Sequence, residues 1–339
     1  MSSPTPYAAL RRHVARVSRT DRGVVRLRGA DRAAWLQGLV TNDVLGLAPG
    51  RRVYAAWLTP QGRMLTDLWA VAMPEAILLD VPAGLAADLA ARLDGLIFAE
   101  DVQIDDVSAD VAVTDIVGVS GEGGISTSGL VVPDTTYGRP GLVVYGPFEA
   151  VTLEQGRAEL ADAPVVSLGA LEVLRIEAGV PRFLVDMATD TIPLEAGLED
   201  RAISFTKGCY VGQEIIVRVT TRGGGRVARR LVGLVLDEVA QLAADEWSGQ
   251  SSSRAGDAAG IPMAPAGYPV QAGDRAIGQV TSLTRSPLLD RWIALATVHR
   301  DFTEPGTSVT VALPGGLARA SVHALPFVGG EHPAHPETP

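Results

Sequence analysis

A change of pattern near residue 226 is the feature that most constrains how this chain can fold. From Arg226 to residue 328 the sequence holds short runs rich in β-branched residues, such as RRLVGLVLDE, WIALATVHRD and SVTVALP, separated by Gly and Pro turns. Short strands at this spacing are typical of a small antiparallel barrel or sandwich. We therefore predict a small antiparallel barrel or sandwich over 226–328, followed by a disordered tail over 329–339.

Residues 1–225 alternate strand-like and helix-like segments, which predicts an α+β region. RRVYAAWLT and GRMLTDLWAVAM are joined by a Pro-Gln-Gly turn, so we expect them to pair as a hairpin. GVVRLRG, residues 23–29, alternates apolar and charged residues like an edge strand. We expect residues 75–163 to form a small α+β lobe and residues 244–266, rich in Ser, Gly, Ala and Pro, to form a long surface loop.

Length and charge restrict the class of protein. A chain of 339 residues is longer than one core usually serves, which predicts more than one packed unit. Its 29 basic and 39 acidic side chains give a net charge of −10, which disfavours direct binding to nucleic acid. It has no run of eighteen apolar residues, and its N-terminal segment lacks the apolar core of a secretory signal. We expect a soluble, cytoplasmic protein without membrane association.

Cys209 is the only cysteine, so an internal disulfide and a cysteine-rich metal site are both excluded. It lies in KGCYVGQE, residues 207–214, with a glycine on each side and the cation of Lys207 two residues away. If a helix begins at Gln213, its dipole also favours a thiolate, although the EIIVRVTT that follows is β-branched and prefers a strand. The alternative is that this cysteine is a small buried hydrophobe.

KGCYVGQE matches the K-G-C-aromatic-x-G-Q-E signature of the YgfZ folate-binding family, a relative of the glycine-cleavage T-protein (aminomethyltransferase). LRIEAGVPRFLVDM, TIPLEAGL, ISF and WLQGLVTNDV also resemble this family, in its order. The resemblance implies an α+β, three-lobed ring with ferredoxin-like lobes and a C-terminal antiparallel β-barrel. It implies tetrahydrofolate, or a one-carbon derivative, as ligand. It also implies a role in the assembly or repair of iron–sulfur clusters in client enzymes, including enzymes that modify tRNA.

The resemblance assigns roles within the motif. Cys209 would be a reactive thiol near the folate, and Lys207 would lower its pKa and orient an intermediate. Tyr210 would lie beside the folate, while Gln213 and Glu214 would fix the loop. The resemblance assigns no settled reaction, so it does not decide whether the chain is an enzyme.

Three carboxylates are candidates for holding the pterin, because a buried carboxylate can meet its row of donors with charge-assisted hydrogen bonds of roughly 1.5–3 kcal/mol each. Glu177 and Arg175 lie in an R-x-E stretch that resembles the folate-contacting segment of the T-protein, and Glu195 has apolar neighbours. Asp67 is the only acid in MLTDLWAV, where the comparable T-protein strand carries two aspartates. The alternatives are that Glu177 pairs with an arginine on a wet helix face and that Asp67 is exposed on an edge strand.

Two other functions stay open at this point. One is aminomethyl transfer, which is disfavoured because the T-protein motif lacks the Gly-Cys pair and because Thr66 replaces an acid. The other is a non-catalytic, RNA-associated module, for which the only support is a set of four arginines: Arg222, Arg226, Arg229 and Arg230. We predict no metal site, because outside the C-terminal tail the five histidines share no ligand spacing.

Overall fold

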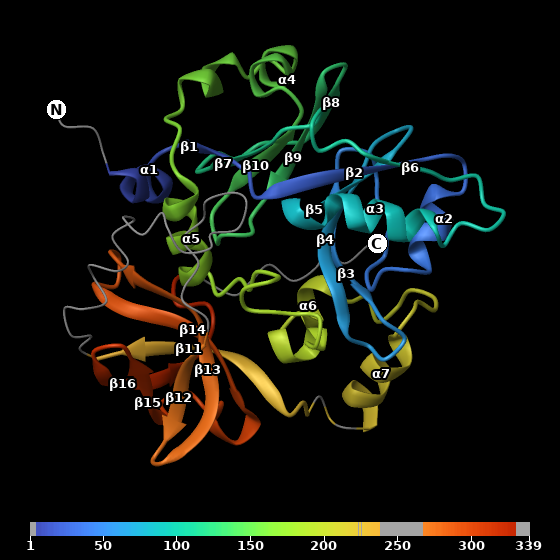
Figure 1. Ribbon diagram of the computed structural model, residues 1–339. Helices are drawn as coiled ribbons and strands as arrows, with labels where there is room; N and C mark the ends of the chain where they lie inside the picture. The colour runs from blue at the N-terminus through green and yellow to red at the C-terminus, as the bar shows by residue number, and fades with distance from the viewer. Residues whose placement is uncertain (1–4, 223, 225, 238–266, 330–339) are drawn as a thin grey trace.

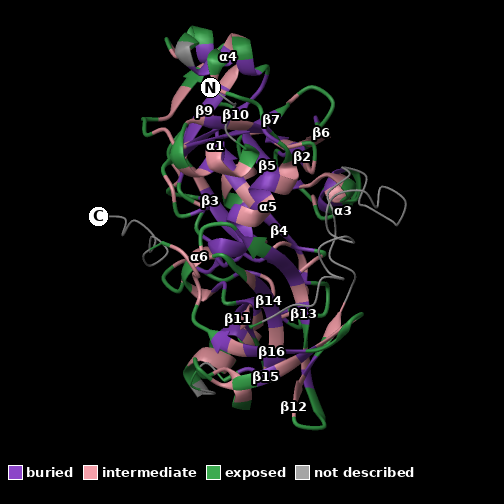
Figure 2. Cartoon of the chain, turned by 90° about the vertical axis from the view of Figure 1, so that its left-hand side faces the viewer, coloured by how far each residue is buried: buried purple, intermediate pink, exposed green. Residues whose placement is uncertain are grey.

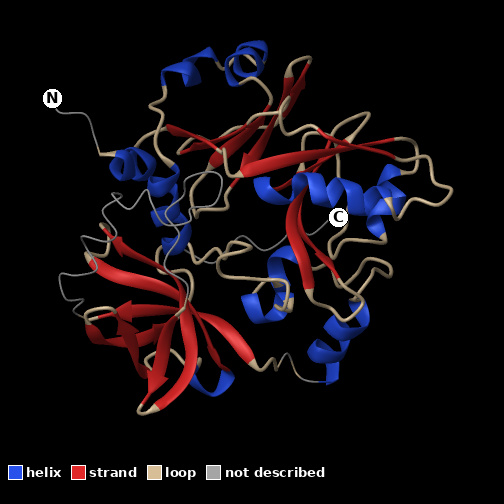
Figure 3. Ribbon diagram, viewed as in Figure 1, coloured by secondary structure: helices blue, strands red, loops and turns tan. Residues whose placement is uncertain are grey.

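The computed structural model of the protein describes residues 5–222, 224, 226–237 and 267–329. These residues form three lobes, two of them built on five-stranded sheets and the third a closed barrel (Figure 1). Strands dominate all three lobes, and the helices lie on their outer faces or between them (Figure 3). The loop predicted over 244–266 and the tail beyond residue 329 lie outside the described residues.

The first antiparallel sheet has five strands, in the order β3 (Arg52–Leu58), β4 (Met64–Ala72), β5 (Ile77–Pro82), β2 (Arg22–Arg28) and β6 (Gln103–Asp106). Pairing of β3 with β4 confirms the predicted hairpin. Its outer face packs on α2 (Arg32–Gln37) and on α3 (Ala86–Asp94), which follows the short 3₁₀ turn η1 (Ala83–Leu85). The prediction of an edge strand at residues 23–29 is wrong, because β2 lies between β5 and β6, where Arg26 and Arg28 both reach Asp105.

The second antiparallel sheet has the order β1 (Ala15–Ser18), β7 (Val113–Val117), β10 (Gly141–Tyr145), β9 (Gly129–Asp134) and β8 (Gly124–Ser126). α4 (Phe148–Glu154) and η2 (Ala158–Asp162) cover one face. α1 (Pro6–Arg12) and α5 (Leu168–Glu177) pack together beside β1. Residues 75–163 therefore differ from the separate lobe that we expected: they supply strands to both sheets, because β5 and β6 pair with β2 while β7 pairs with β1.

The two sheets face each other across a shared apolar core. Val24, Val71 and Leu78 of the first sheet pack against residues of the second: Val113, Val132, Val143 and Tyr145. Burial is concentrated along the strands, and exposed residues gather in the loops and turns (Figure 2). The N-terminal region is thus a two-sheet sandwich, with helices outside it.

The C-terminal lobe is a closed barrel with the strand order β11 (Arg229–Leu236), β14 (Arg291–His299), β13 (Arg275–Ser286), β12 (Tyr268–Ala272), β15 (Ser308–Leu313) and β16 (Gly316–His323). A 3₁₀ turn, η5 (Arg300–Phe302), follows β14. Aliphatic side chains such as Leu234, Val280 and Val311 fill the interior. The predicted barrel is therefore confirmed, and with it the T-protein type of α+β fold. None of the described helices is long and apolar enough to cross a membrane.

A largely helical segment connects the sandwich to the barrel through η3 (Pro193–Ala196), α6 (Glu199–Ala202), α7 (Gln213–Val217) and the π-helical turn η4 (Arg218–Arg222). Of the helix and the strand left open after Gly212, the structure has the helix, which begins at Gln213 in spite of its β-branched residues. Gly212 has φ +85°, and a Cβ there would lie 2.6 Å from the carbonyl oxygen of Thr59. Only glycine permits this approach to the β3–β4 turn, and the approach buries Ile216 in the core.

Candidate functional site

Lys207 fastens the KGCYVGQE loop to the end of α2. Its Nζ donates to the backbone carbonyls of Gln37 (2.6 Å), Val40 (2.6 Å) and Asn42 (3.0 Å). Carbonyls at the end of a helix have no partner within the helix, so the ammonium satisfies groups that would otherwise lack donors. Burial lowers the pKa of Lys207 to about 8, and the charge of Asp43 partly opposes this shift. All three N–H donors of a lysine ammonium are thereby used by the backbone.

The rest of the motif presents Cys209 to solvent. Tyr210 is buried in the core with Leu58 and Met64, and burial raises the pKa of Tyr210 to about 12. The Val211 N–H donates to the carbonyl of Gly38 (3.1 Å), which fixes the loop from the other side. Cys209 itself is exposed, so the alternative of a buried hydrophobic cysteine is wrong.

The last two predicted motif residues begin α7. The backbone N–H of Gln213 donates to the Tyr210 carbonyl (3.2 Å), and Glu214 lies exposed in the first turn. Glu195 lies in η3, where its half-buried carboxylate accepts from the Ile192 N–H (3.1 Å). The roles that the resemblance implies for these residues stay predictions.

Glu177 lies at the junction of α1, α5 and the barrel. Its carboxylate is fully buried and accepts hydrogen bonds from Tyr7 (2.7 Å), Arg11 (2.6 Å) and Ser286. The wet helix face considered as an alternative is therefore wrong, although an arginine partner is present. Both carboxylate oxygens have donors from the protein itself, and the contacts join the first helix to β13.

Arg175 makes a second junction two residues earlier on α5. Its guanidinium donates to Asp186 (2.7 Å), to Glu172 (2.6 Å) and to the hydroxyl of Ser282 (2.6 Å). These charged partners raise the pKa of Arg175 against the opposing effect of burial. Pterin binding by Arg175 and Glu177 stays a prediction; the contacts observed here connect the sandwich to the barrel.

Asp67 lies on the inner face of the sandwich. Successive strand residues point to opposite faces, so Thr66, paired with Trp57, faces the helices, whereas Asp67 faces the second sheet with Trp69. Asp67 is 5% exposed and β4 is an internal strand, so the alternative of an exposed edge-strand acid is wrong.

The two carboxylate oxygens of Asp67 differ. Oδ2 accepts from the Tyr54 hydroxyl at 2.7 Å, whereas Oδ1 is buried and has no hydrogen-bond partner within the described part of the chain. Desolvation raises the pKa of Asp67, and the Asp80 charge adds to this, while Arg22 and the Tyr54 hydrogen bond oppose it. A buried carboxyl with one free oxygen can hold a proton or accept N–H donors from a ligand.

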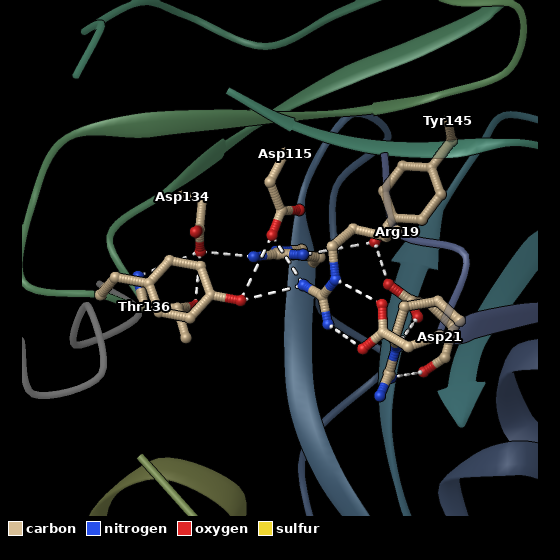
Figure 4. A network of polar contacts seen from close by, with 10 residues as sticks. Arg19, Asp21, Asp115, Asp134, Thr136 and Tyr145 are labelled. Atoms are coloured by element: carbon tan, nitrogen blue, oxygen red, sulfur yellow. Dashed lines mark hydrogen bonds and ion pairs between the residues drawn. The ribbon is translucent and has the colours of Figure 1, made fainter. Parts of the chain in front are cut away.

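A charged network lies between the sheets (Figure 4). Asp80 accepts from Arg22 (2.5 Å) and from the Tyr145 hydroxyl (2.8 Å). Arg52 contacts Tyr145 (3.3 Å) and forms an ion pair with Asp134. Farther along, Arg19 binds two acids and a phenol, namely Asp115 (2.6 Å), Asp21 (2.8 Å) and Tyr137 (2.9 Å). The inner space of the sandwich is thus apolar on one side and charged on the other.

Planar side chains cluster beside Asp67. The ring centroids of Tyr54 and Trp69 are 5.0 Å apart, and the ring planes are tilted by 46°. The guanidinium carbon of Arg52 lies 3.9 Å from the centroid of the Trp69 ring, and that of Arg201 lies 5.6 Å from the centroid of the Tyr54 ring. Arginines close to aromatic rings make a surface suited to a flat, partly polar ligand.

Our sequence predictions missed most of these residues, although two of them carry the signal that identified Asp67. Asp80 in ILLDVP and Arg52 in RRVYAAWLT are charged residues within otherwise apolar strand runs. Tyr54 and Arg201 carry no such signal, because a tyrosine in a strand and an arginine in a polar turn are both ordinary. No cluster of His, Cys, Asp or Glu among the described residues has the arrangement of a metal site.

Comparison with known proteins places this geometry in context. The GCVT N-terminal domain matches residues 5–123, and the glycine cleavage T-protein C-terminal barrel domain matches residues 257–329. The aminomethyltransferase of Synechococcus elongatus is 30% identical over 366 residues, covering 96% of this chain and 87% of that protein. The Bacillus subtilis aminomethyltransferase is 28% identical over 334 residues, covering 90% of this chain and 85% of that protein.

A solved structure shows the same fold. It is the crystal structure of glycine cleavage system aminomethyltransferase T from Bartonella henselae, with a TM-score of 0.77, and the match covers 95% of this chain and 88% of that one. At 21% sequence identity, this likeness concerns the fold alone.

Proposed function

The chain belongs to the glycine-cleavage T-protein (aminomethyltransferase) family, and from that premise we propose that it binds tetrahydrofolate or a one-carbon derivative. One observation carries the proposal: the free Oδ1 of buried Asp67, beside the neighbouring rings of Tyr54 and Trp69. A reduced pterin supplies both missing elements, because it has N–H donors for a carboxylate and a flat ring for an aromatic surface.

Folate binding can be tested directly with Asp67→Asn. Titration calorimetry of the full chain with tetrahydrofolate, without oxygen, should show roughly 10-fold or greater weakening, because one charge-assisted hydrogen bond is worth about 1.5–3 kcal/mol. Asp105→Asn, at an exposed ion pair of β6, is the matched control. Equal affinity of wild type and Asp67→Asn for tetrahydrofolate would remove Asp67 from the site.

For the role of the bound folate, we propose support of iron–sulfur enzymes through the thiol of Cys209. The motif supports this proposal by its construction: Lys207 and Tyr210 fix the loop from inside, and Cys209 alone carries a nucleophile to the surface. An exposed thiol on a fixed loop can react with a partner protein without unfolding. Lys207 contributes here by holding the loop, since its donors are occupied by carbonyls.

The cellular test uses a strain that is defective in cluster-dependent tRNA methylthiolation. Cys209→Ala and Lys207→Ala should each abolish rescue, the first by removing the thiol and the second by freeing the loop. Circular dichroism should show an intact fold for both variants, and Arg230→Met serves as a surface control. Full rescue by both motif variants would defeat the role proposed for the motif.

Aminomethyl transfer is the second candidate, and one observation favours it. Asp67 occupies the inner face of the sandwich, so the loss of an acid at Thr66 leaves the inward-facing acid in place. Incubation with aminomethyl-loaded lipoyl carrier protein and tetrahydrofolate distinguishes the two functions. Ammonia release that requires Asp67 and survives Cys209→Ala would establish transferase activity, whereas its absence would favour the thiol-dependent role.

A further inference from the structure

Arg201, in the last turn of α6, is a partly buried cation without a partner. Its guanidinium lies 5.6 Å from the centroid of the Tyr54 ring. Within the described residues, no carboxylate or carbonyl forms an ion pair or hydrogen bond with this guanidinium. The hydrogen bonds of Arg201 there involve its backbone: its N–H donates to the Leu198 carbonyl (3.1 Å), and its carbonyl accepts from the Asn42 side chain (3.3 Å). Burial lowers the pKa of Arg201, while the nearby carboxylates of Asp134 and Asp67 oppose this shift.

The other arginines of the network all have acidic partners. Three guanidiniums are matched with four carboxylates: Arg19 with Asp21 and Asp115, Arg22 with Asp80, and Arg52 with Asp134. Two groups are left over, the guanidinium of Arg201 and the Oδ1 of Asp67. Tyr54 lies between them, with its hydroxyl on Asp67 and its ring facing Arg201. The unmatched charges are therefore opposite in sign and separated by about one tyrosine side chain.

An unpaired buried charge costs free energy, so the partners of these two groups are expected to come from outside the chain. Their charges cancel, which favours a neutral ligand that has N–H donors for Asp67 and an oxygen acceptor for Arg201. A carboxylate group would instead add a negative charge beside a network that already contains more acids than arginines. The edge of a pterin ring has N–H donors next to a carbonyl oxygen and carries no charge.

We propose that Arg201 is a specificity-determining residue of the folate site, where its guanidinium donates to the carbonyl oxygen of the pterin ring. This inference rests on the proposed function, because it assigns a contact within the same site. The pterin ring would lie beside the cluster of Trp69, Tyr54 and Arg201. Arg201 thus recognises the pterin ring of the ligand, and this contact does not require the glutamate tail of folate.

The experiment measures binding of two ligands to the full-length protein by calorimetry without oxygen. One ligand is tetrahydrofolate, and the other is 6-methyltetrahydropterin, which has the ring but lacks the tail. Arg201→Met should weaken both ligands by about 10- to 100-fold, the range expected for hydrogen bonds to a charged group. Arg201→Lys should cause a smaller loss, because lysine keeps the charge but not the planar fork.

Arg230→Met is the matched control, since Arg230 pairs with Glu199 of the same helix α6, and its affinities should equal those of wild type. Unchanged binding of both ligands by Arg201→Met would overturn the inference alone. A loss confined to tetrahydrofolate would also overturn it, by assigning Arg201 to the tail carboxylates. If wild type binds neither ligand, the proposed function itself fails. Should the methionine variant prove misfolded by circular dichroism, the lysine variant decides by the same comparison.

Discussion

The sandwich and the barrel are both built from antiparallel strands, but their interiors differ. The barrel core consists of aliphatic side chains such as Leu234, Val280 and Val311. The inner space of the sandwich instead includes four arginines and five aspartates around Tyr54 and Tyr145. Buried ion pairs are poor sources of stability, because desolvation offsets much of their attraction. The barrel interior is thus aliphatic, whereas the sandwich interior holds the charged groups around which we propose the ligand site.

The largest effect should come from breaking one ion pair of the sandwich. Arg52→Met leaves the buried carboxylate of Asp134 without its cation, and we expect the free energy of unfolding to fall by about 3–5 kcal/mol. Urea denaturation measures this loss. Arg285→Met in the barrel breaks an exposed pair with Asp290 and should cost about 1 kcal/mol or less. Equal losses in the free energy of unfolding for Arg52→Met and Arg285→Met would contradict the difference between the sandwich and the barrel.

A cavity in the barrel should cost nearly as much stability without affecting the ligand. Leu234→Ala removes a fully buried side chain, and we expect a loss of about 2–5 kcal/mol in the same urea assay. Its affinity for tetrahydrofolate at a temperature where the variant is folded should equal that of wild type. Weakened binding would show that the barrel shapes the site directly.

Asp67→Asn should have the opposite effect on stability. Because the folded-state pKa of Asp67 is raised, the folded protein holds a proton that the unfolded chain loses above the ordinary value of 3.8, so wild-type stability falls as pH rises past that value. Asp67→Asn has no carboxyl group at this position, so its stability does not fall in this way as the pH rises. We expect it to be more stable than wild type by roughly 1 kcal/mol at pH 7, with no gain below pH 3.8. Parallel stability curves from pH 3 to pH 8 would contradict the expectation.

The smallest effect should come from the motif cysteine. Cys209 is exposed, so Cys209→Ser should change the free energy of unfolding by less than about 0.5 kcal/mol. A thiol reagent should modify one site per native molecule of wild type and none in the variant. A thiol that reacts only after denaturation would refute the exposed position.

Local patterns predicted the parts of the molecule that depend on neighbouring residues. The β3–β4 hairpin follows from its Pro-Gln-Gly turn, and the barrel follows from short strands at regular spacing. In α7, the left-handed conformation of Gly212 and tertiary packing outweigh the preference of β-branched residues for a strand. A helix therefore begins at Gln213. Asp67 was found because one acid interrupts an apolar strand.

The remaining features depend on contacts between distant residues. The exchange of strands between the two sheets within 75–163 could not be read locally, since β1 and β7 are almost one hundred residues apart. Tyr54 and Arg201 meet across an even longer interval. The contacts of Glu177 with α1 and of Arg175 with the barrel likewise join distant residues, which no local pattern reveals.

The lysine contact at the end of α2 has a consequence for biosynthesis. Lys207 leaves the ribosome long after Gln37, Val40 and Asn42, so the carbonyls that it caps must wait for more than 160 further residues. During that interval the first sheet can assemble from residues 22–106, but the turn after α2 has not received its cation. The first sheet can therefore form before the loop that carries the Cys209 thiol is synthesised. A chain that stops short of residue 207 lacks both the Lys207 contacts and this thiol.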